Sequence, residues 1–178
     1  IPAVDRILDD ACTLLAARRM DQAVDTLELP WSVPTTVLFP LLTVSGVLDD
    51  EGFPKLEETK VFLEMTRGQA LAHLVSRWRS SDAFDVLRLI PHLQIEGKWK
   101  YFPRQTREKF LEMLGSLPKD VWWSLPAFIQ TVRDIAPDIQ RKAGEYDSWY
   151  IRDRRTDQYL RGFENWEAVD GELIRFLV

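Results

Sequence analysis

The chain has 178 residues, of which 46% are hydrophobic and 29% are charged, and a formal net charge of −5, an ordinary globular composition. No run approaches the roughly 18 uncharged apolar residues of a membrane helix, and Asp5 and Arg6 interrupt the first apolar run, which argues against a secretory signal. The single cysteine, Cys12, excludes an internal disulfide and a thiolate zinc cage, so we expect a cytoplasmic protein without membrane contact.

Residues 1–81 begin with three predicted helices. Apolar residues at helical spacing predict the first helix over about residues 2–18. The residues that share its apolar face are Val4, Ile7, Leu8, Ala11, Leu14 and Leu15. A shorter helix is expected from Met20 to Leu27, because Pro30 follows it. The third helix starts near a capping Ser32, and Pro40 inside it predicts a kink or an early end.

A β-hairpin is predicted after these helices. Its strands are VLDDEG and KVFLEM, because hydrophobicity alternates over residues 61–65. Thr66 then caps a long helix whose apolar stripe is Ala70, Leu71, Leu74, Val75 and Trp78. Helix, helix, helix, strand, turn, strand is the order of a winged-helix unit. Asp49, Asp50 and Glu51 in the turn would repel phosphate, so this unit is expected to contact a protein surface rather than DNA.

Residues 82–178 give a similar order after a connector that reaches about Gly97. A helix is expected from about Arg104 to Leu117, and Ser124 caps another with the stripe Phe128, Ile129, Val132 and Ile135. Between them, VWWSL indicates a short strand in which one of Trp122 and Trp123 faces inward. SWYIRDRRTDQYLRGF predicts a β-hairpin that turns near residues 154–157. A last helix carries the stripe Trp166, Val169, Leu173, Ile174 and Leu177.

These elements predict an α+β, mostly helical fold of tandem winged-helix-like units with short β-hairpins. The chain lacks the patterns that carry catalysis, since no P-loop, GxGxxG, HExxH, Cys-x-x-Cys or GxSxG motif is present. His73 and His92 have no acidic or thiol neighbours at ligand spacing, and nothing near Cys12 activates its thiol. We therefore expect structural roles for these side chains, no enzyme activity, and no metal, cofactor or small-molecule substrate.

Charge is distributed unevenly, at −7 over residues 1–66, +5 over 67–161 and −3 over 162–178. Basic residues mixed with aromatic ones occur in KWKYFPR and in the second hairpin. The candidate nucleic-acid-binding residues are Lys98, Lys100, Arg104, Arg152, Arg154, Arg155 and Arg161. Such side chains contact phosphates without reading the sequence. Asp153 and Asp157 partly cancel the hairpin charge, and a solvated surface or contact with an acidic patch of a protein partner explains the same residues.

Three segments carry a further pattern: GQALAHLVSRWRSSDAFDVLRLIPHL (Gly68 to Leu93), TREKFLEMLGSLPKDVWWSLPAFIQTVR (Thr106 to Arg133) and YDSWYIRDRRTDQYLRGFENWEAVDGELIRFLV (Tyr146 to Val178). The last contains the distinctive Tyr-Asp-Ser-Trp-Tyr and Gly-Phe-x-x-Trp sequences. In these segments the chain resembles bacterial helicase-associated proteins that carry a domain like the N-terminal domain of XPB-type helicases. The resemblance implies tandem winged-helix-like architecture and an association with DNA transactions, and it supplies no catalytic residues.

The sequence thus indicates a non-catalytic accessory binding module of a DNA-transaction protein, which contacts DNA, a protein partner or the rest of its parent chain. The alternative is a purely structural or regulatory protein-interaction domain in which the basic residues are ordinary surface. An enzyme is a third interpretation. Because the sequence starts at Ile1 and stops inside the apolar helical pattern GELIRFLV, we expect a fragment excised from a longer protein.

Overall fold

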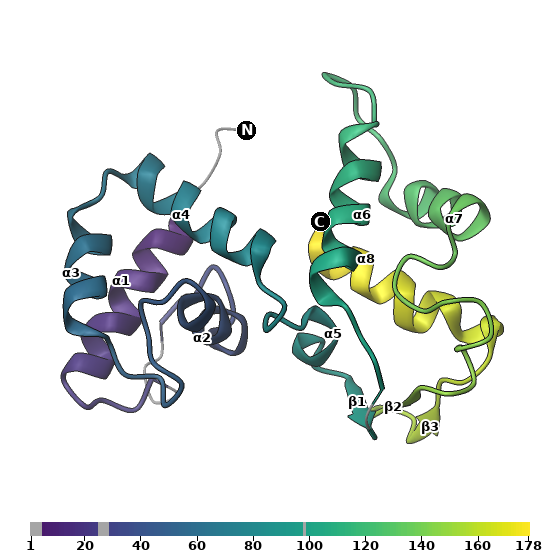
Figure 1. The fold of residues 1–178 in the computed structure, drawn as a ribbon, viewed down its shortest axis with the longest axis horizontal. Coiled ribbons are helices and arrows are strands. Elements are labelled where there is room, and N and C mark those ends of the chain that lie inside the picture. The colour runs from purple at the N-terminus through teal and green to yellow at the C-terminus, as the bar shows by residue number, and fades with distance from the viewer. Residues whose placement is uncertain (1–4, 25–28, 98) are drawn as a thin grey trace. The chain divides into compact units, whose positions relative to one another are not determined.

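The computed structural model describes residues 5–24, 29–97 and 99–178. The chain divides into two compact units, Ile1–Phe84 and Asp85–Val178. The first unit is built from helices, and the second combines helices with a small antiparallel sheet (Figure 1), which confirms the α+β, mostly helical class. Within the described ranges, no helix combines the length and the apolar character that crossing a lipid bilayer requires.

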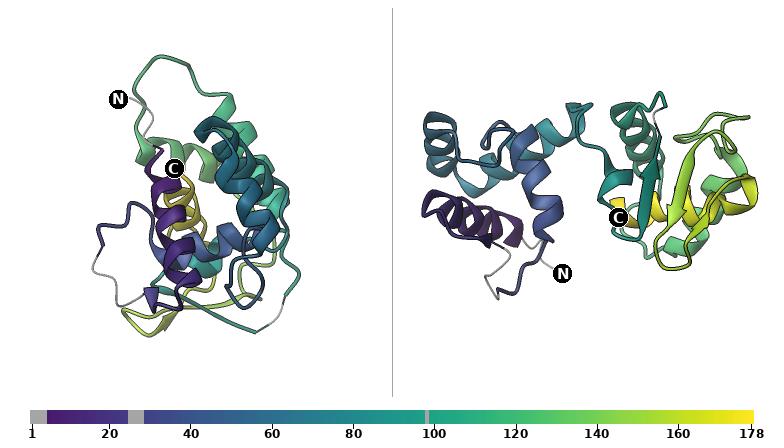
Figure 2. Two further views of the ribbon diagram at one scale, coloured as in Figure 1. Left: turned by 90° about the vertical axis from the view of Figure 1, so that its left-hand side faces the viewer. Right: turned by 90° about the horizontal axis from the view of Figure 1, so that it is seen from below.

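The first unit contains the helices α1 (Arg6–Arg19), α2 (Thr35–Val44), α3 (Leu56–Glu64) and α4 (Arg67–Ser80). Helix α1 confirms the first predicted helix, and it contacts α2 and α4 (Figures 1 and 2). The core of this unit includes Leu8, Ala11, Leu14, Leu15, Leu38, Leu41, Leu42, Phe62, Ala70 and Leu74. The helix predicted from Met20 to Leu27 is wrong for Met20–Val24, where Asp21 with φ 55° breaks the helical path. Residues 25–28 lie outside the described residues.

Helix α2 differs from its prediction in two details. Ser32 does not cap it, because α2 begins at Thr35 with Pro34 at its N-cap position, and the Ser32 hydroxyl instead donates to the Asp10 carboxylate. Pro40 does not end the helix, which continues beyond it. An interior proline costs about 3 kcal/mol, and burial of the leucines on either side of it offsets that cost. Packing therefore overrides the local signal.

The β-hairpin predicted for the first unit is wrong. Helix α3 occupies its second strand, and the described part of this unit holds only an isolated β-bridge. In the predicted strand Val61, Leu63 and Met65 alternate with Phe62 and Glu64, whereas in α3 Phe62 is the buried side chain and Val61 and Leu63 are exposed. A short alternating run fits a strand or a helix face equally well. The leucine, glutamate and lysine content of this segment favours the helix.

Helix α4 begins after Thr66, as predicted. The Thr66 hydroxyl accepts a hydrogen bond from the Gln69 backbone N–H at 3.4 Å, and Gln69 Oε1 accepts one from the Thr66 N–H at 3.0 Å. This reciprocal capping box satisfies two N–H groups that a helix N-terminus leaves without partners. In the predicted stripe Ala70 and Leu74 are buried, but Val75 is exposed.

The second unit starts with α5 (Val86–Leu89), β1 (Leu93–Glu96), α6 (Pro103–Gly115) and α7 (Leu125–Ile135), and continues with β2 (Tyr150–Asp153) and β3 (Gln158–Tyr159). A 3-10 helix, η2 (Phe163–Asn165), and a π-helical turn, η3 (Glu167–Gly171), then lead into α8 (Glu172–Leu177). Helices α6 and α7 match the two predicted helices. The Ser124 hydroxyl caps α7, accepting a hydrogen bond from the Ala127 N–H at 3.4 Å, as predicted.

The predicted C-terminal hairpin is confirmed, and a third strand joins it. Strands β2 and β3 are antiparallel, and the turn between them occupies residues 154–157. Strand β1 lies in the segment expected to be a connector and pairs antiparallel with β2, so the sheet order is β1–β2–β3. With four residues, β1 is too short for its periodicity to stand out in the sequence.

The strand predicted at VWWSL is wrong, because residues 119–124 form a turn and loop between α6 and α7. Asp120, with φ 60°, interrupts an extended path there. Trp122 is 95% exposed, whereas Trp123 is 37% exposed and its ring lies 5.4 Å from the ring of Phe128. One tryptophan of the pair therefore contacts the body of the unit, and the other projects into solvent.

The core of the second unit gathers Phe110, Phe128, Ile129, Val132, Ile139, Tyr146, Trp166 and Ile174. The stripe predicted for the last helix is buried at Trp166, Val169, Leu173 and Ile174. The Trp166 indole N–H donates to the Pro137 carbonyl at 2.8 Å. The same interior holds an ion pair in which Arg141 Nε donates to Asp170 Oδ2 at 3.0 Å, and neither side chain reaches solvent.

Candidate nucleic-acid interface

Buried and exposed side chains alternate along strand β2 of the small sheet in the second unit. Along β2, Tyr150 is exposed and Arg152 half-buried, whereas Ile151 and Asp153 are buried. Successive side chains of a strand point to opposite faces. Since Arg152 lies opposite Tyr159 in the β2–β3 register, Tyr150, Arg152 and Tyr159 share the outward face.

Two tyrosines and two arginines form a surface that we call the tyrosine–arginine face: Tyr150, Tyr159, Arg152 and Arg161. Tyr150 and Tyr159 are each 48% exposed, and their rings meet edge to face with centroids 6.2 Å apart. The Arg161 guanidinium lies 5.2 Å from the centre of the Tyr150 ring, and that of Arg152 lies 6.0 Å from the Tyr159 ring. Cation–π contacts of this kind orient both partners while leaving them accessible.

Carboxylates on both sides hold Arg152 in this face. Its Nη2 lies 2.7 Å from Glu96 Oε1 on β1, and its Nη1 lies 2.8 Å from Asp157 Oδ1. The Tyr159 hydroxyl donates to Glu96 Oε2 at 2.7 Å, and this hydrogen bond raises the pKa of the Tyr159 phenol. Arg152 therefore orders the face and offers little free positive charge.

The hairpin tip carries one paired and one unpaired arginine. Arg155 forms a two-pronged contact with the buried Asp153 carboxylate, with its Nη2 2.7 Å and its Nε 3.2 Å from Oδ2. The Arg154 backbone N–H donates to the His92 carbonyl at 2.8 Å, which holds the tip against the turn before β1. The Arg154 side chain is exposed and forms no ion pair with any residue that the structure describes. Arg154 is therefore the free cation of the tip.

Acid titration tests the pair at the tip. Hydrogen bonds from Arg155 lower the pKa of Asp153 to about 2, below its usual value of about 3.9. The stability that this pair contributes is fully present above about pH 4 and is lost as the pH falls through about 2. We expect Arg155→Ala to move the pKa of Asp153 up toward its usual value, as measured by carboxyl-carbon NMR. Arg154→Ala is the control and should leave it at about 2; equal values in both variants would contradict the pairing.

The KWKYFPR segment contributes less than its sequence predicts. Lys98 lies outside the described residues. Lys100 is exposed, and Arg104 Nε lies 3.0 Å from Glu108 Oε1, one turn further along α6. Trp99 and Tyr101 are not free for stacking, because both pack on the buried Trp149 ring, which precedes β2, whereas Phe102 is exposed. This packing brings the segment to the base of the hairpin.

Sequence reasoning missed Tyr150, Tyr159 and Glu96 as members of the site. The tyrosines carried a signal, because alternation along the predicted β2 already put Tyr150 and Arg152 on one face. Glu96 carried none, because its contacts depend on β1 pairing with β2 across a long stretch of chain.

Cys12 and the two histidines are further side chains with chemistry of their own, and His92 Nε2 lies 3.5 Å from Glu172 Oε2. The His73 ring Nε2 lies 3.0 Å from the Ser45 carbonyl oxygen, and burial raises the pKa of the Cys12 thiol. Across residues 5–24, 29–97 and 99–178, no three His, Cys, Asp or Glu side chains are grouped so that they could hold a metal ion.

Comparison of the chain with protein-family models, curated proteins and solved structures gave no match. The site is therefore interpreted from its own chemistry: exposed rings beside guanidinium groups, and cations at Lys100 and Arg154 that form no ion pair within the described residues. Such a surface can stack on planar groups and neutralise phosphates.

Proposed function

We propose that this chain is a non-catalytic accessory binding module of a helicase-associated or other DNA-transaction protein, and that its second unit contacts nucleic acid. The tyrosine–arginine face carries this proposal. Bases stack on aromatic rings and guanidinium planes whatever their identity, and cations beside them contact the phosphates. The site therefore binds without sequence preference, and it favours single strands because their bases are free to stack.

We also propose that the second unit is winged-helix in type. The order of α5, α6, α7, β2, turn and β3 supports this, since three helices precede a hairpin that would serve as the wing. Arg154 at the tip of that hairpin is where a wing contacts the phosphate backbone. The first unit gives no such support, because α3 replaces its predicted hairpin.

Local placement of charge matters more here than its total. Residues 85–178 contain 15 Lys and Arg and 15 Asp and Glu, so the unit has no net charge to attract a polyanion. Exposed cations without a carboxylate partner, such as Lys100 and Arg154, must supply the attraction. We therefore expect few phosphate contacts and a modest salt dependence.

A salt titration with a fluorescent oligothymidine and a duplex of equal length tests the proposal. The double variant Tyr150→Ala, Tyr159→Ala should bind the single strand about 5- to 150-fold more weakly for each stacked base that is lost. Arg154→Ala should flatten the slope of log affinity against log salt by about 0.7, the value for one phosphate contact on a single strand.

Lys119→Ala is the matched control, because Lys119 is an exposed cation of the α6–α7 loop outside the face. It should change neither quantity. If neither oligonucleotide binds at low salt, or if the control weakens binding as much as Arg154→Ala does, nucleic-acid binding by this face is refuted.

The second candidate function is a purely structural or regulatory protein-interaction domain. The pairing of Arg104 with Glu108 and of Arg155 with Asp153 favours it, since paired arginines are common on surfaces that bind nothing. This candidate predicts no nucleic-acid binding at any salt concentration.

A further inference from the structure

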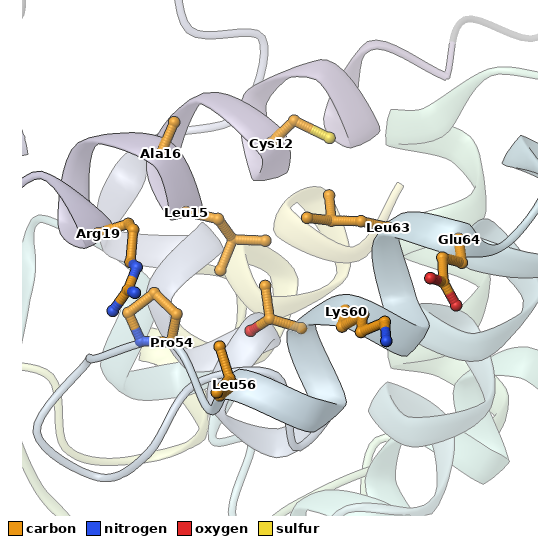
Figure 3. Close-up of a pocket in the computed structure, with 10 residues that line it drawn as sticks. Cys12, Leu15, Ala16, Arg19, Pro54, Leu56, Lys60, Leu63 and Glu64 are labelled. Atoms are coloured by element: carbon orange, nitrogen blue, oxygen red, sulfur yellow. The ribbon is translucent and has the colours of Figure 1, made fainter.

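A groove of about 490 Å³ lies between α1 and α3 of the first unit (Figure 3). Each helix contributes side chains at helical spacing, so the groove has one wall per helix. The lining residues are Cys12, Leu15, Ala16 and Arg19 of α1, and Leu56, Thr59, Lys60, Leu63 and Glu64 of α3, with Pro54 before it. Positions i, i+3, i+4 and i+7 recur on both helices, which is the spacing of a seam between helices.

Most residues of this seam lie outside the core of the unit. Helix α1 directs Leu8, Ala11 and Leu14 to the interior, and α3 directs Phe62 there. At the groove Leu15 is buried and forms the floor, whereas Leu56 is 69% and Leu63 is 53% exposed. Helix α3 therefore presents Leu56 and Leu63 as an exposed apolar stripe opposite the α1 wall, where Leu15 is buried.

Three charged residues lie at the rim of the groove. Arg19 lies at one end of the groove beside Pro54, Lys60 lies midway along α3, and Glu64 lies at the other end near Cys12 (Figure 3). None of the three forms an ion pair within the part of the chain that the structure describes. The rim thus presents positive charge over one end and the middle, and negative charge at the far end.

We propose that this groove docks an amphipathic helix of a partner protein, with an apolar stripe on the groove floor and acidic residues facing Arg19 and Lys60. Cys12 and Arg19 are seven steps apart on α1, or about 10 Å at 1.5 Å per residue, which matches about two turns of a partner helix. Apolar anchors at i, i+3 or i+4 and i+7 of that helix fit such a length. The charge order also places the acidic end of that helix at Arg19.

A helix suits this groove better than a small molecule does. Small-ligand sites bury about 70–90% of the ligand, whereas Leu56 and Leu63 are exposed along the length of this groove. The inference concerns the first unit and gives the accessory module of the proposed function its protein-binding side. The inference rests on the proposed function only for the role of the groove in an accessory module, since the residues proposed to bind nucleic acid belong to the second unit.

A display library of amphipathic helical peptides tests the inference on the full chain. The apolar stripe of each peptide is fixed, and the flanking positions vary among Glu, Lys, Gln and Ser. We expect selection to enrich Glu on the side that faces Arg19 and Lys60. The best peptide should bind Leu63→Asp and Lys60→Glu about tenfold or more weakly. A bulky maleimide on Cys12, the only cysteine, should block the peptide.

Val61→Asp is the matched control, because Val61 lies on α3 outside the groove and its exposure of 55% is close to that of Leu63. It should bind the peptide as the unmodified chain does, and circular dichroism should show equal helix content in all variants. No enrichment of peptides, enrichment of Lys in place of Glu, or equal loss in Val61→Asp would overturn the inference. Tight binding of the apolar anion anilinonaphthalene sulfonate at Cys12 without peptide binding would overturn it in favour of a small ligand.

These outcomes are separable from those of the nucleic-acid titration. The peptide assay contains no nucleic acid, and Tyr150→Ala, Tyr159→Ala should bind the peptide normally. Conversely, Leu63→Asp should bind oligothymidine normally.

Discussion

Replacement of Asp170 by alanine is expected to lower the free energy of unfolding of the second unit by about 3–5 kcal/mol, the usual effect of breaking a buried ion pair from one side. Arg141 and Asp170 are both fully buried, and two nitrogens of the guanidinium, Nε and Nη2, donate to Oδ2 of the carboxylate. Without Asp170, the Arg141 charge would remain in an apolar interior. The ion pair therefore contributes to stability mainly because Asp170 neutralises the buried charge of Arg141.

The surroundings of Arg141 explain why it cannot escape to solvent. Its guanidinium lies 4.8 Å from the centre of the Tyr146 ring, and the Tyr146 hydroxyl donates to Asp138 Oδ1 at 2.7 Å. Burial and the Asp138 contact raise the pKa of Tyr146, so it stays a neutral donor. Burial likewise raises the pKa of Asp170, and Arg141 opposes that rise. Arg141 Nη1 has no hydrogen-bond partner among the described residues, so loss of Asp170 would remove the carboxylate on which the buried guanidinium depends and leave its contact with the Tyr146 ring.

Urea unfolding followed by NMR signals of the second unit measures the loss. Asp147→Ala is the control, because Asp147 is an exposed carboxylate of the same unit, and its change should stay within about 0.5 kcal/mol. The double variant Arg141→Met, Asp170→Leu should recover most of the stability, since apolar replacements of a buried pair are often neutral or better. A loss below about 1 kcal/mol in Asp170→Ala would show that the arginine finds other partners.

Replacement of Trp149 by alanine is expected to cost about 3–5 kcal/mol, the usual range for removal of a large buried aromatic side chain. The Trp149 ring stacks on Trp99 with centroids 4.8 Å apart and planes inclined by 23°, and Tyr101 meets its edge at 5.5 Å. Such aromatic pairs add about 0.5–1.5 kcal/mol each beyond area burial. Loss of Trp149 therefore removes the anchor of the segment that carries Lys100.

Hydrogen exchange at residues 99–101 reports on that anchor. Exchange should accelerate in Trp149→Ala and change little in Trp149→Phe, which keeps a ring for Trp99 to stack on. Trp122→Ala is the control, since its side chain is 95% exposed and should cost within about 0.5 kcal/mol. A similar loss of stability in Trp122→Ala and Trp149→Ala would contradict the packing described here.

The C-terminal hairpin, which was predicted correctly, and the loop at VWWSL, which was predicted as a strand, show how much of this fold the sequence predicts. The hairpin was predictable because alternation around Ile151 and a polar turn are both local signals. The residues of VWWSL did not exclude a strand. Asp120, which precedes this run, has a left-handed backbone angle that interrupts an extended path, and the apolar residues after it give no sign of that angle. Tertiary contacts likewise stabilise α2 beyond Pro40, where the sequence predicted a kink or an end of the helix. Local patterns therefore predicted an element correctly where the hydrophobic residues followed one periodicity, helical or alternating. They failed where the residues fitted both periodicities and tertiary packing determined the conformation.

The candidate site shows the same division. The arginines of the hairpin were predictable as a cluster, because they are close together in the sequence. The sequence did not predict which of these arginines keeps a free charge, because Arg152 is neutralised by Glu96, which lies on another strand. The groove between α1 and α3 was also beyond the sequence, since α3 itself was mistaken for a strand.

The π-helical turn η3 allows three consecutive residues, Val169, Asp170 and Gly171, to face the interior together. An α-helix turns by about 100° per residue, so three successive side chains would fan out over more than half its circumference. Such a wide turn is an α-helix with one residue inserted. Deletion of one solvent-facing residue, Glu167, would thus convert the turn to ordinary α-helix and keep the same face of α8 toward the interior. Asp170 would then no longer point inward. The length of this segment, and not only its letters, determines whether Arg141 has a partner.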